Sequence, residues 1–189
     1  MTATHPPANA PRLSLPEEGI TDGTVRLRMP VADDIDGLMP AFEDPVLREA
    51  GNLPEIGRDE MLATLPHLPA LAATGRLLPM IAADARTDMV VGGGTLHHLD
   101  ADRSIVEIGY WVLPAARRRR FATRIARLLA EHSFDLGIER VAGYVNVRNR
   151  ASERVLELAG FHREGVVRSL PVPNGSRVDK TLFSLLPGE

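Results

Sequence analysis

The stretch Glu107-Ile-Gly-Tyr-Trp-Val-Leu-Pro-Ala-Ala-Arg-Arg-Arg-Arg-Phe-Ala-Thr123 changes from the pattern of a strand to that of a helix. Residues 104–112 form an apolar, β-branched run of strand length, whereas Phe121, Ile125 and Leu129 recur at helical spacing. The pattern predicts a strand that runs through an arginine-rich turn into a helix. The free N–H groups at such a helix start bind anions, and a pyrophosphate would fit there.

The segments on both sides of this stretch complete an α+β pattern. Strand-like runs lie at 23–28, 77–83, 90–99, 104–112, 140–147, 162–170 and 179–186, and helical patterns at 33–42, 58–74, 121–136 and 149–159. Pro66 and Pro69 should break the second helix, and residues 44–57 are expected to form a loop. This order predicts a mixed, mostly antiparallel sheet of about seven strands flanked by about four helices.

Length and composition are those of one globular domain. The chain has 189 residues, of which 44% are hydrophobic and 25% charged. We expect residues 1–20, rich in Pro, Ala and Thr, to be disordered and residues 21–187 to form a single domain. No apolar run approaches a membrane span, the N-terminus lacks a secretory signal and there is no cysteine, so we expect a cytoplasmic protein without membrane contact. The net charge of −3 argues against general affinity for nucleic acid.

The central stretch resembles the donor-binding motif of the GNAT (GCN5-related N-acetyltransferase) superfamily. It is most similar to the RimJ/RimL-like ribosomal-protein N-acetyltransferases, in which Glu-Ile-Gly-Tyr-Trp precedes an Arg/Gln-x-x-Gly-x-Gly/Ala turn. Further matches follow in the same order, at Asn149-Arg-Ala-Ser152, Ala159-Gly-Phe161, Glu164-Gly165, Arg168, Asn174-Gly175 and Asp179. The resemblance covers roughly residues 25–186. It implies the GNAT fold and an N-acetyltransferase with acetyl-CoA as co-substrate, and a homodimer only by analogy.

The resemblance also implies which residues bind acetyl-CoA. They come from the strand end, the turn, the first helical residues and a later asparagine: Trp111, Val112, Leu113, Arg117, Arg118, Arg119, Arg120, Phe121, Ala122, Thr123 and Asn149. The turn departs from the family pattern, because Arg120 replaces the usual glycine and Arg118 stands where many relatives also have glycine. Either the main chain still binds the donor and the guanidinium pairs with its phosphates, or the donor has changed. A merely solvated turn is a third interpretation, although cations at a helix N-terminus oppose the dipole.

Two side chains are candidates for the chemistry of acyl transfer, which needs a deprotonated amine, a stabilised oxyanion and a protonated leaving thiolate. Glu107 is a lone carboxylate among apolar strand positions and is the candidate general base, directly or through water. Alternatively, it forms an ion pair with Arg103 or another base. Ser152 matches the family's candidate acid, or else bonds a backbone carbonyl or shares a capping role with Asn149.

The histidines and Asp179 receive no firm catalytic role. His97 and His98 are adjacent and should face opposite sides of a strand, so we expect no metal site. His132 lies on the apolar stripe of its helix and is expected to be packed, and His162 is expected to be an ordinary strand residue. Asp179 either orients an acceptor amine or forms a salt bridge.

One function and two alternatives follow from these residues. The first is transfer of an acetyl group from acetyl-CoA to a primary amine, on a protein N-terminus or a small molecule, by direct attack in a ternary complex, since no cysteine can carry the acyl group. One alternative is a GNAT-fold transferase of a natural-product pathway with aminoacyl-tRNA as donor, because four arginines could hold RNA phosphates. The other is a non-catalytic module that binds acyl-CoA. The sequence does not select the acceptor amine.

Overall fold

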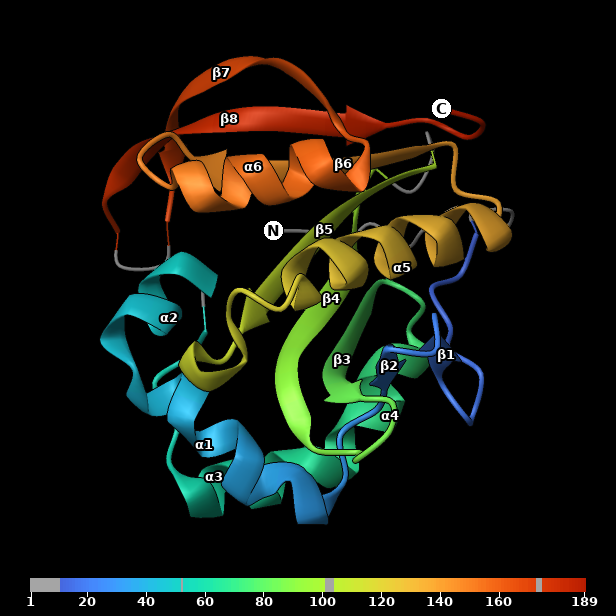
Figure 1. Ribbon diagram of the computed structural model, residues 1–189, viewed down its shortest axis with the longest axis vertical. Helices are drawn as coiled ribbons and strands as arrows, with labels where there is room; N and C mark the ends of the chain where they lie inside the picture. The colour runs from blue at the N-terminus through green and yellow to red at the C-terminus, as the bar shows by residue number, and fades with distance from the viewer. Residues whose placement is uncertain (1–10, 52, 101–103, 173–174) are drawn as a thin grey trace.

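An eight-stranded mixed sheet forms the centre of the protein in the computed structural model, which describes residues 11–51, 53–100, 104–172 and 175–189 (Figure 1). Neighbouring strands follow the spatial order β1-β2-β3-β4-β5-β6-β8-β7, and every pair is antiparallel except the parallel pair β5 and β6. The strands are β1 (Ile20–Thr21), β2 (Val25–Arg28), β3 (Leu77–Asp84), β4 (Val90–Asp100), β5 (Ile105–Val112), β6 (Arg140–Asn146), β7 (His162–Pro171) and β8 (Arg177–Leu185).

Five of the six helices in the described residues form two groups, and α4 packs against β3. Figure 1 shows α5 and α6 lying beside each other on one face of the sheet, while α1, α2 and α3 gather near the end of β5. The helices are α1 (Ile35–Glu43), α2 (Pro45–Gly51), α3 (Arg58–Thr64), α4 (Leu68–Ala73), α5 (Phe121–Asp135) and α6 (Arg150–Ala159), with short 3-10 turns at Ala32–Asp34, Leu65–His67 and Pro114–Ala116.

Helix α5 packs its apolar stripe on the middle of the sheet. Phe121, Ile125 and Leu129 are each at most 2% exposed, and burying side chains of this size stabilises a fold by about 1.5–3 kcal/mol each. Gly94 of β4 lets the helix approach closely, because a Cβ at that position would lie 3.1 Å from a methyl group of Leu129. This packing fixes the start of α5 beside the end of β5.

The predicted α+β sheet is confirmed, and the structure adds elements to it. An eighth strand, β1, pairs with β2 through only two residues. Residues 44–57, expected to form a loop, contain α2. The Asp44 carboxylate accepts hydrogen bonds from the N–H groups of Val46 (2.8 Å) and Leu47 (3.3 Å), and Pro45 occupies the first helical position. Asp followed by Pro was therefore a helix start rather than a loop signal.

The segment expected to be disordered lies partly outside the described residues, which begin at residue 11. Residues 11–20 pack against the body: Leu13 is 1% exposed, and the Ser14 and Pro11 carbonyl oxygens lie 2.6 and 2.9 Å from Nε2 of His132 and His98. The expectation of disorder is therefore wrong for residues 11–20, because averaged composition hides one buried leucine. The single domain at residues 21–187 stays a proposal. Residues 11–20 add Leu13 to the core of that domain.

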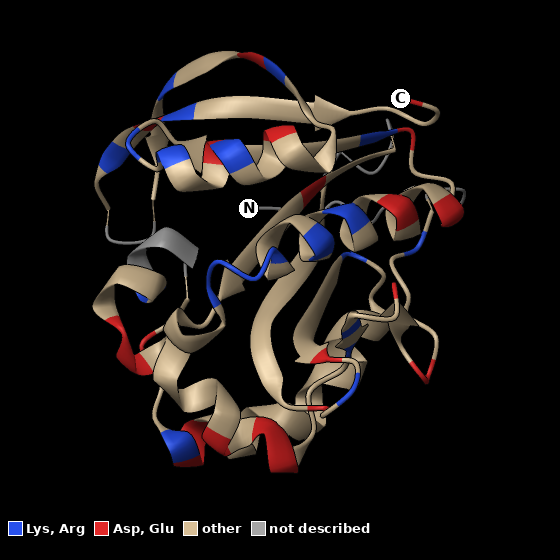
Figure 2. Ribbon diagram, viewed as in Figure 1, with Lys and Arg blue, Asp and Glu red and all other residues tan. Residues whose placement is uncertain are grey.

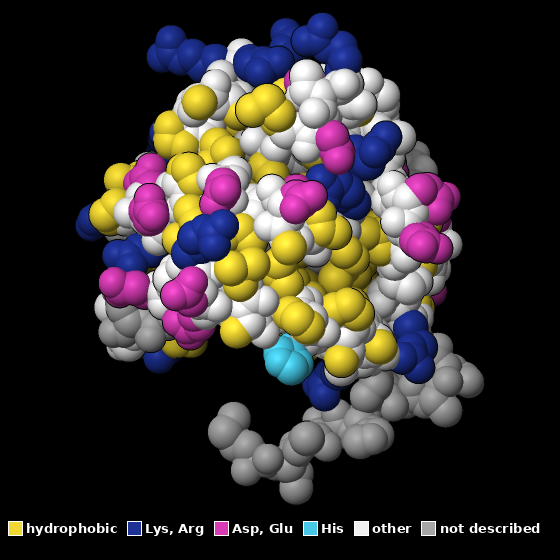
Figure 3. All heavy atoms as spheres, turned by 90° about the horizontal axis from the view of Figure 1, so that it is seen from below, with side chains coloured by type: hydrophobic (Ala, Val, Ile, Leu, Met, Phe, Trp, Pro, Cys, Tyr) yellow, Lys and Arg dark blue, Asp and Glu magenta, His cyan; other side chains and the backbone are white. Residues whose placement is uncertain are grey.

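The face seen from below is partly apolar. Figure 3 shows hydrophobic side chains gathered between scattered charges over this face, to which α1, α3 and α4 contribute. Val31 and Leu71 are among the exposed large hydrophobic residues, at 51% and 39%. Among the described residues, no helix combines the length and apolarity that crossing a membrane requires.

Candidate active site

Strands β5 and β6 separate after a short parallel pairing. Three residue pairs join them, from Ile105 with Arg140 to Glu107 with Ala142, and beyond that point β5 continues to Val112 and β6 to Asn146 without pairing to each other. We call the unpaired halves, 108–112 of β5 and 143–146 of β6, the fork. Along the fork, β5 has β4 as its only hydrogen-bonded neighbour within the described sheet. Backbone donors and acceptors on its other edge are therefore available to a ligand.

The alternation of the β4–β5 ladder decides which backbone groups face the fork. The N–H of Leu113 donates to the Val91 carbonyl (2.9 Å), so it points toward β4. In an antiparallel ladder the direction alternates from residue to residue, so Trp111 also pairs with β4, whereas Tyr110 and Val112 direct their backbone groups toward the fork. Of the predicted strand-end residues Trp111, Val112 and Leu113, the middle one thus presents its main chain to a donor.

The arginine turn keeps the backbone shape that glycine usually supplies. Arg118 and Arg120 have positive φ angles of 63° and 62°, in the left-handed region that side-chain-bearing residues seldom occupy. Arg120 is the N-cap of α5 and makes no side-chain capping bond. The first backbone bond back to the turn runs from the N–H of Arg124 to the Arg120 carbonyl (3.2 Å). The N–H groups of Phe121, Ala122 and Thr123 consequently lack an acceptor inside the helix and point outward from its start.

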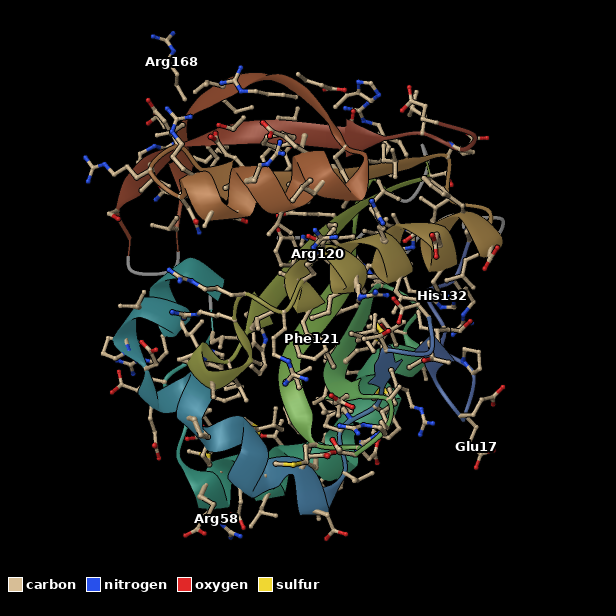
Figure 4. The ribbon with its side chains drawn as sticks, viewed as in Figure 1. Glu17, Arg58, Arg120, Phe121, His132 and Arg168 are labelled. Carbon is tan, nitrogen blue, oxygen red and sulfur yellow. The ribbon has the colours of Figure 1, made fainter. Side chains whose placement is uncertain are left out.

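Positive charge surrounds this helix start (Figure 2). Arg119 is held in place, with its guanidinium 4.7 Å from the centre of the Phe121 ring and 3.4 Å from an Asp84 oxygen. Arg117, Arg118 and Arg120 are exposed and form no ion pair with any described residue. In Figure 4, Arg120 lies at the first turn of α5 on the side of α6, and Phe121 lies on the other side of that turn. Three unpaired cations at a helix N-terminus favour an anionic ligand.

The first turn of α6 and strand β5 together form a polar cluster. Asn149 caps the helix, because its side-chain oxygen accepts the N–H of Ser152 (3.0 Å). The Ser152 hydroxyl lies 2.8 Å from the Tyr110 hydroxyl, and the Tyr110 hydroxyl oxygen also lies 3.1 Å from the Ser152 carbonyl oxygen, within hydrogen-bond distance of both. Burial raises the pKa of Tyr110 far above its ordinary value, partly opposed by the bond with Ser152, so the phenol stays protonated. The expected cap at Asn149 is present, whereas the Ser152 hydroxyl contacts a tyrosine that the sequence did not point to.

Glu107 lies at the point where the fork opens, on the sheet face opposite α5 and α6. Its carboxylate is 3.1 Å from Nε2 of His97 on the neighbouring strand, and the two side chains are 21% and 40% exposed. Burial, followed by the negative charge of Glu107, raises the pKa of Tyr144 on β6. Glu107 thus has a histidine partner with access to solvent, while Arg103, named as its alternative partner, lies outside the described residues.

The remaining predicted residues serve mainly as structure. The side chains of Phe121 and Val112 are in the hydrophobic core and Ala122 packs against it, so these residues can offer a donor only their main chain. Thr123 is half-buried in the first turn of α5. The Asp179 carboxylate accepts the N–H of Ser169 (2.9 Å), which is a local role within the β7–β8 hairpin.

A cavity of about 380 Å³ lies on the side of the sheet that Glu107 faces. Its lining includes Phe42, Glu43, Arg48 and Glu55. Phe42 packs edge-on against Trp111 of β5, with 6.5 Å between ring centres. Arg48 pairs with Glu55 (3.1 Å), and its buried Nε has no hydrogen-bond partner. The cavity therefore adjoins the end of β5 and combines one aromatic ring with two carboxylates and a guanidinium.

Sequence reasoning missed two residues of this site. Tyr110 shares a strand face with the buried Ile108 and Val112, and a buried phenol needs a hydrogen-bond partner, so this pattern indicated a polar contact for Tyr110. His97 became a candidate only through the register that sets it opposite Glu107, and no local motif encodes that register. Within the described parts of the chain, no group of three or more His, Asp or Glu residues could hold a metal ion.

Comparison with known proteins links this geometry to one family. The family model described as "Acetyltransferase (GNAT) domain" matches residues 24–162. A curated relative, the uncharacterized N-acetyltransferase YoaA of Bacillus subtilis, is 32% identical over 101 residues, which cover 53% of this chain and 57% of the relative. The chain thus spans about half the length of the curated relatives that it matches first.

Solved structures share the whole fold. Mycobacterium smegmatis RimJ in complex with CoA-disulfide has a TM-score of 0.75 at 22% identity, covering 90% of this chain and 84% of RimJ. The microcin C7 self-immunity acetyltransferase MccE in complex with acetyl-CoA and AMP has a TM-score of 0.76 at 18% identity, covering 92% of this chain and 98% of that chain. At these identities the likeness concerns the fold.

Proposed function

This chain belongs to the GNAT acetyltransferase family, and from that premise we propose that it transfers an acetyl group from acetyl-CoA to an amine by direct attack in a ternary complex. The observation that carries the proposal is the fork. Its unpaired β5 edge and the outward N–H groups of α5 meet at one place, beside three unpaired arginines.

The donor fits this place by its chemistry. The pantetheine arm of CoA contains amides, which can pair with the free main chain of Val112 and Tyr110 as an added strand would. The pyrophosphate would lie on the N–H groups of residues 121–123, with Arg117, Arg118 and Arg120 available for the phosphates. A structure of MccE with acetyl-CoA in the same fold supports this choice of donor.

The acceptor would approach from the opposite face of the sheet. Glu107, Trp111 and the cavity next to Phe42 all lie on that face, so an amine bound there would reach the thioester across β5. Glu107 would take the amine proton, directly or through water, and His97 would pass that proton on to solvent. The chain has no cysteine to carry the acetyl group, which favours direct attack. A protein N-terminus and a small-molecule amine both remain compatible acceptors.

A transfer assay tests the proposal. Purified protein is incubated with radiolabelled acetyl-CoA and a panel of spermidine, kanamycin and peptides with a free N-terminus, and labelled product is counted. We expect transfer to at least one amine, and a loss of about 10²–10⁴-fold in kcat for Glu107→Gln, since general acid–base catalysis contributes that much. Binding of acetyl-CoA without transfer across the panel would instead favour a non-catalytic module.

A second candidate keeps the fold and uses aminoacyl-tRNA as donor. The three unpaired arginines favour it, because they could hold RNA phosphates as readily as those of CoA. Binding to RNA through several phosphates should weaken steeply as salt rises, by roughly 10³–10⁵ between 50 and 200 mM for 6–10 contacts. A flat salt response in an RNA-binding assay would exclude this donor.

A further inference from the structure

We propose that Tyr110 is a positioning residue that directs the hydroxyl proton of Ser152 toward the leaving sulfur of the donor. The inference rests on the proposed acetyl transfer and extends it to a side chain that touches no substrate atom itself, the phenol of Tyr110. It starts from the two contacts that the Tyr110 hydroxyl makes with one serine, at 3.1 Å to the carbonyl oxygen and 2.8 Å to the hydroxyl.

A phenol has one proton, so these two contacts cannot both be donated by Tyr110. In the first arrangement Tyr110 donates to the Ser152 carbonyl, and the Ser152 hydroxyl must then donate to the phenol oxygen. In the second arrangement Tyr110 donates to the Ser152 hydroxyl oxygen, and the serine proton is free to bond another acceptor. The serine hydroxyl can donate its proton to a ligand in the second arrangement only.

The surroundings restrict the cluster to a change between these two arrangements. Burial keeps the phenol protonated, and Asn149 fixes the Ser152 backbone through its N–H (3.0 Å). Tyr110 extends from the β5 half of the fork to α6, the helix that follows β6, so the cluster lies beside the edge of β5 along which the donor arm would bind. A sulfur entering the fork is the acceptor that would favour the second arrangement.

The transfer step replaces the C–S bond of the thioester by a C–N bond to the amine. The amine nitrogen bonds the thioester carbon, its proton passes to Glu107, and the C–S bond breaks with its electron pair on sulfur. The thiolate accepts the hydrogen bond of the Ser152 hydroxyl, whose oxygen accepts that of Tyr110, and it later takes a proton from solvent. Tyr110 thus polarises Ser152 when negative charge develops on sulfur, where such a bond lowers the barrier.

Steady-state kinetics on four variants test this role with the amine that gives turnover in the transfer assay. The variants are Tyr110→Phe, Ser152→Ala, their combination, and Ser133→Ala as a control. Ser133 is a buried α5 serine whose hydroxyl only bonds the Leu129 carbonyl (2.7 Å), far along the helix from the fork. Thermal unfolding of each variant reports folding separately from turnover.

We expect Tyr110→Phe and Ser152→Ala each to lower kcat about tenfold with the KM for acetyl-CoA changed by less than about twofold, the mark of an interaction made in the transition state. The double variant should match Ser152→Ala alone, because the two hydroxyls act as one unit. Ser133→Ala should keep the kcat of the unchanged protein.

Two results would overturn the role of Tyr110 while leaving acetyl transfer intact. They are multiplicative losses in the double variant, and a Tyr110→Phe protein with lower thermal stability but unchanged kcat, as a purely structural tie would give. No turnover in the unchanged protein with any amine would contradict the proposed function and this inference together.

Discussion

Arg120 combines the backbone of a glycine with the charge of a cation. Its φ of 62° costs a non-glycine residue roughly 1–2 kcal/mol, and Arg118 at 63° bears the same strain. Strain of this kind concentrates at functional sites. Here it accompanies a turn that leaves the first N–H groups of α5 free for an anion, and the guanidinium groups add positive charge around it.

Substitutions at Arg120 distinguish the cost of its left-handed backbone from the effect of its charged side chain. Arg120→Gly should raise the free energy of unfolding by up to about 1 kcal/mol, since relief of strain exceeds the entropy that glycine adds to the unfolded chain. Arg120→Ala keeps the strain and should be near neutral. Arg117→Gly is the matched control: its φ of −65° is ordinary, so glycine should destabilise by about 0.5–1 kcal/mol. Urea unfolding measures all three, and equal effects at 117 and 120 would speak against strain at Arg120.

For single residues, the sequence pointed to those that lie within a recognisable motif. Asn149 was expected to cap a helix and does so. Glu107 was singled out as a carboxylate among apolar neighbours, and its role as general base stays a prediction. The pairing of Glu107 with His97 depends on strand register, and the bond between Ser152 and Tyr110 depends on how α6 crosses β5. Such contacts join residues distant in sequence, so no local pattern could reveal them.

Helix α6 is fastened to the sheet by a buried carboxylate. Glu153 is 6% exposed and accepts bonds from the Thr181 hydroxyl of β8 and from Arg150, each 2.6 Å. The bond with Thr181, followed by that with Arg150, lowers the pKa of Glu153 below its ordinary value of 4.5. This tie holds the helix whose first turn carries Asn149 and Ser152.

Replacing this carboxylate should weaken the fold in a pH-dependent way. We expect Glu153→Gln to lower the free energy of unfolding by about 1–3 kcal/mol at pH 7, as for a hydrogen bond to a charged group. A depressed folded pKa stabilises the fold above the unfolded value of 4.5, and this contribution disappears as pH falls through the folded pKa. The difference between the proteins should therefore shrink below pH 4.5. Glu157→Gln, in an exposed α6 pair with Arg154, should cost less than about 1 kcal/mol throughout.

For helices and strands, the sequence predicted the kind of the long elements and missed two short ones. The long periodic runs of β4, β5 and α5 were recognised with boundaries within one or two residues. Helix α2 was missed because its seven residues are too few to show a period, and β1 because two residues carry no alternation. The one local signal in these two elements was the helix start at Asp44 and Pro45.

The whole molecule includes the segment before β1. Leu13 joins the main hydrophobic core, and the segment bonds β4 and α5 through His98 and His132. Leu13→Ala should lower the free energy of unfolding by about 2–4 kcal/mol, the usual cost of truncating a buried leucine. Leu71→Ala, at a side chain 39% exposed, should cost less than about 1 kcal/mol. Equal effects in urea unfolding would mean that the segment adds nothing to the core.

The overall architecture was the most predictable level, because the order of strands and helices and the linked motifs pointed to one fold. The acceptor was the least predictable. Its side of the sheet is built from α1, α2 and the cavity at Phe42, whose lining of two carboxylates and one arginine exists only after folding. These charges lie within the segment 43–55, but only the fold of α1 and α2 turns them toward one cavity.

The fork and the arginine turn together form the proposed binding site for acetyl-CoA. Isothermal titration of acetyl-CoA into the unchanged protein tests it most directly, with Arg120→Ala as a comparison. We predict one-to-one binding with a dissociation constant well below about 1 mM, or about −4.1 kcal/mol, and weaker binding to Arg120→Ala. An absence of binding heat at millimolar acetyl-CoA, from a protein that unfolds cooperatively, would contradict the account.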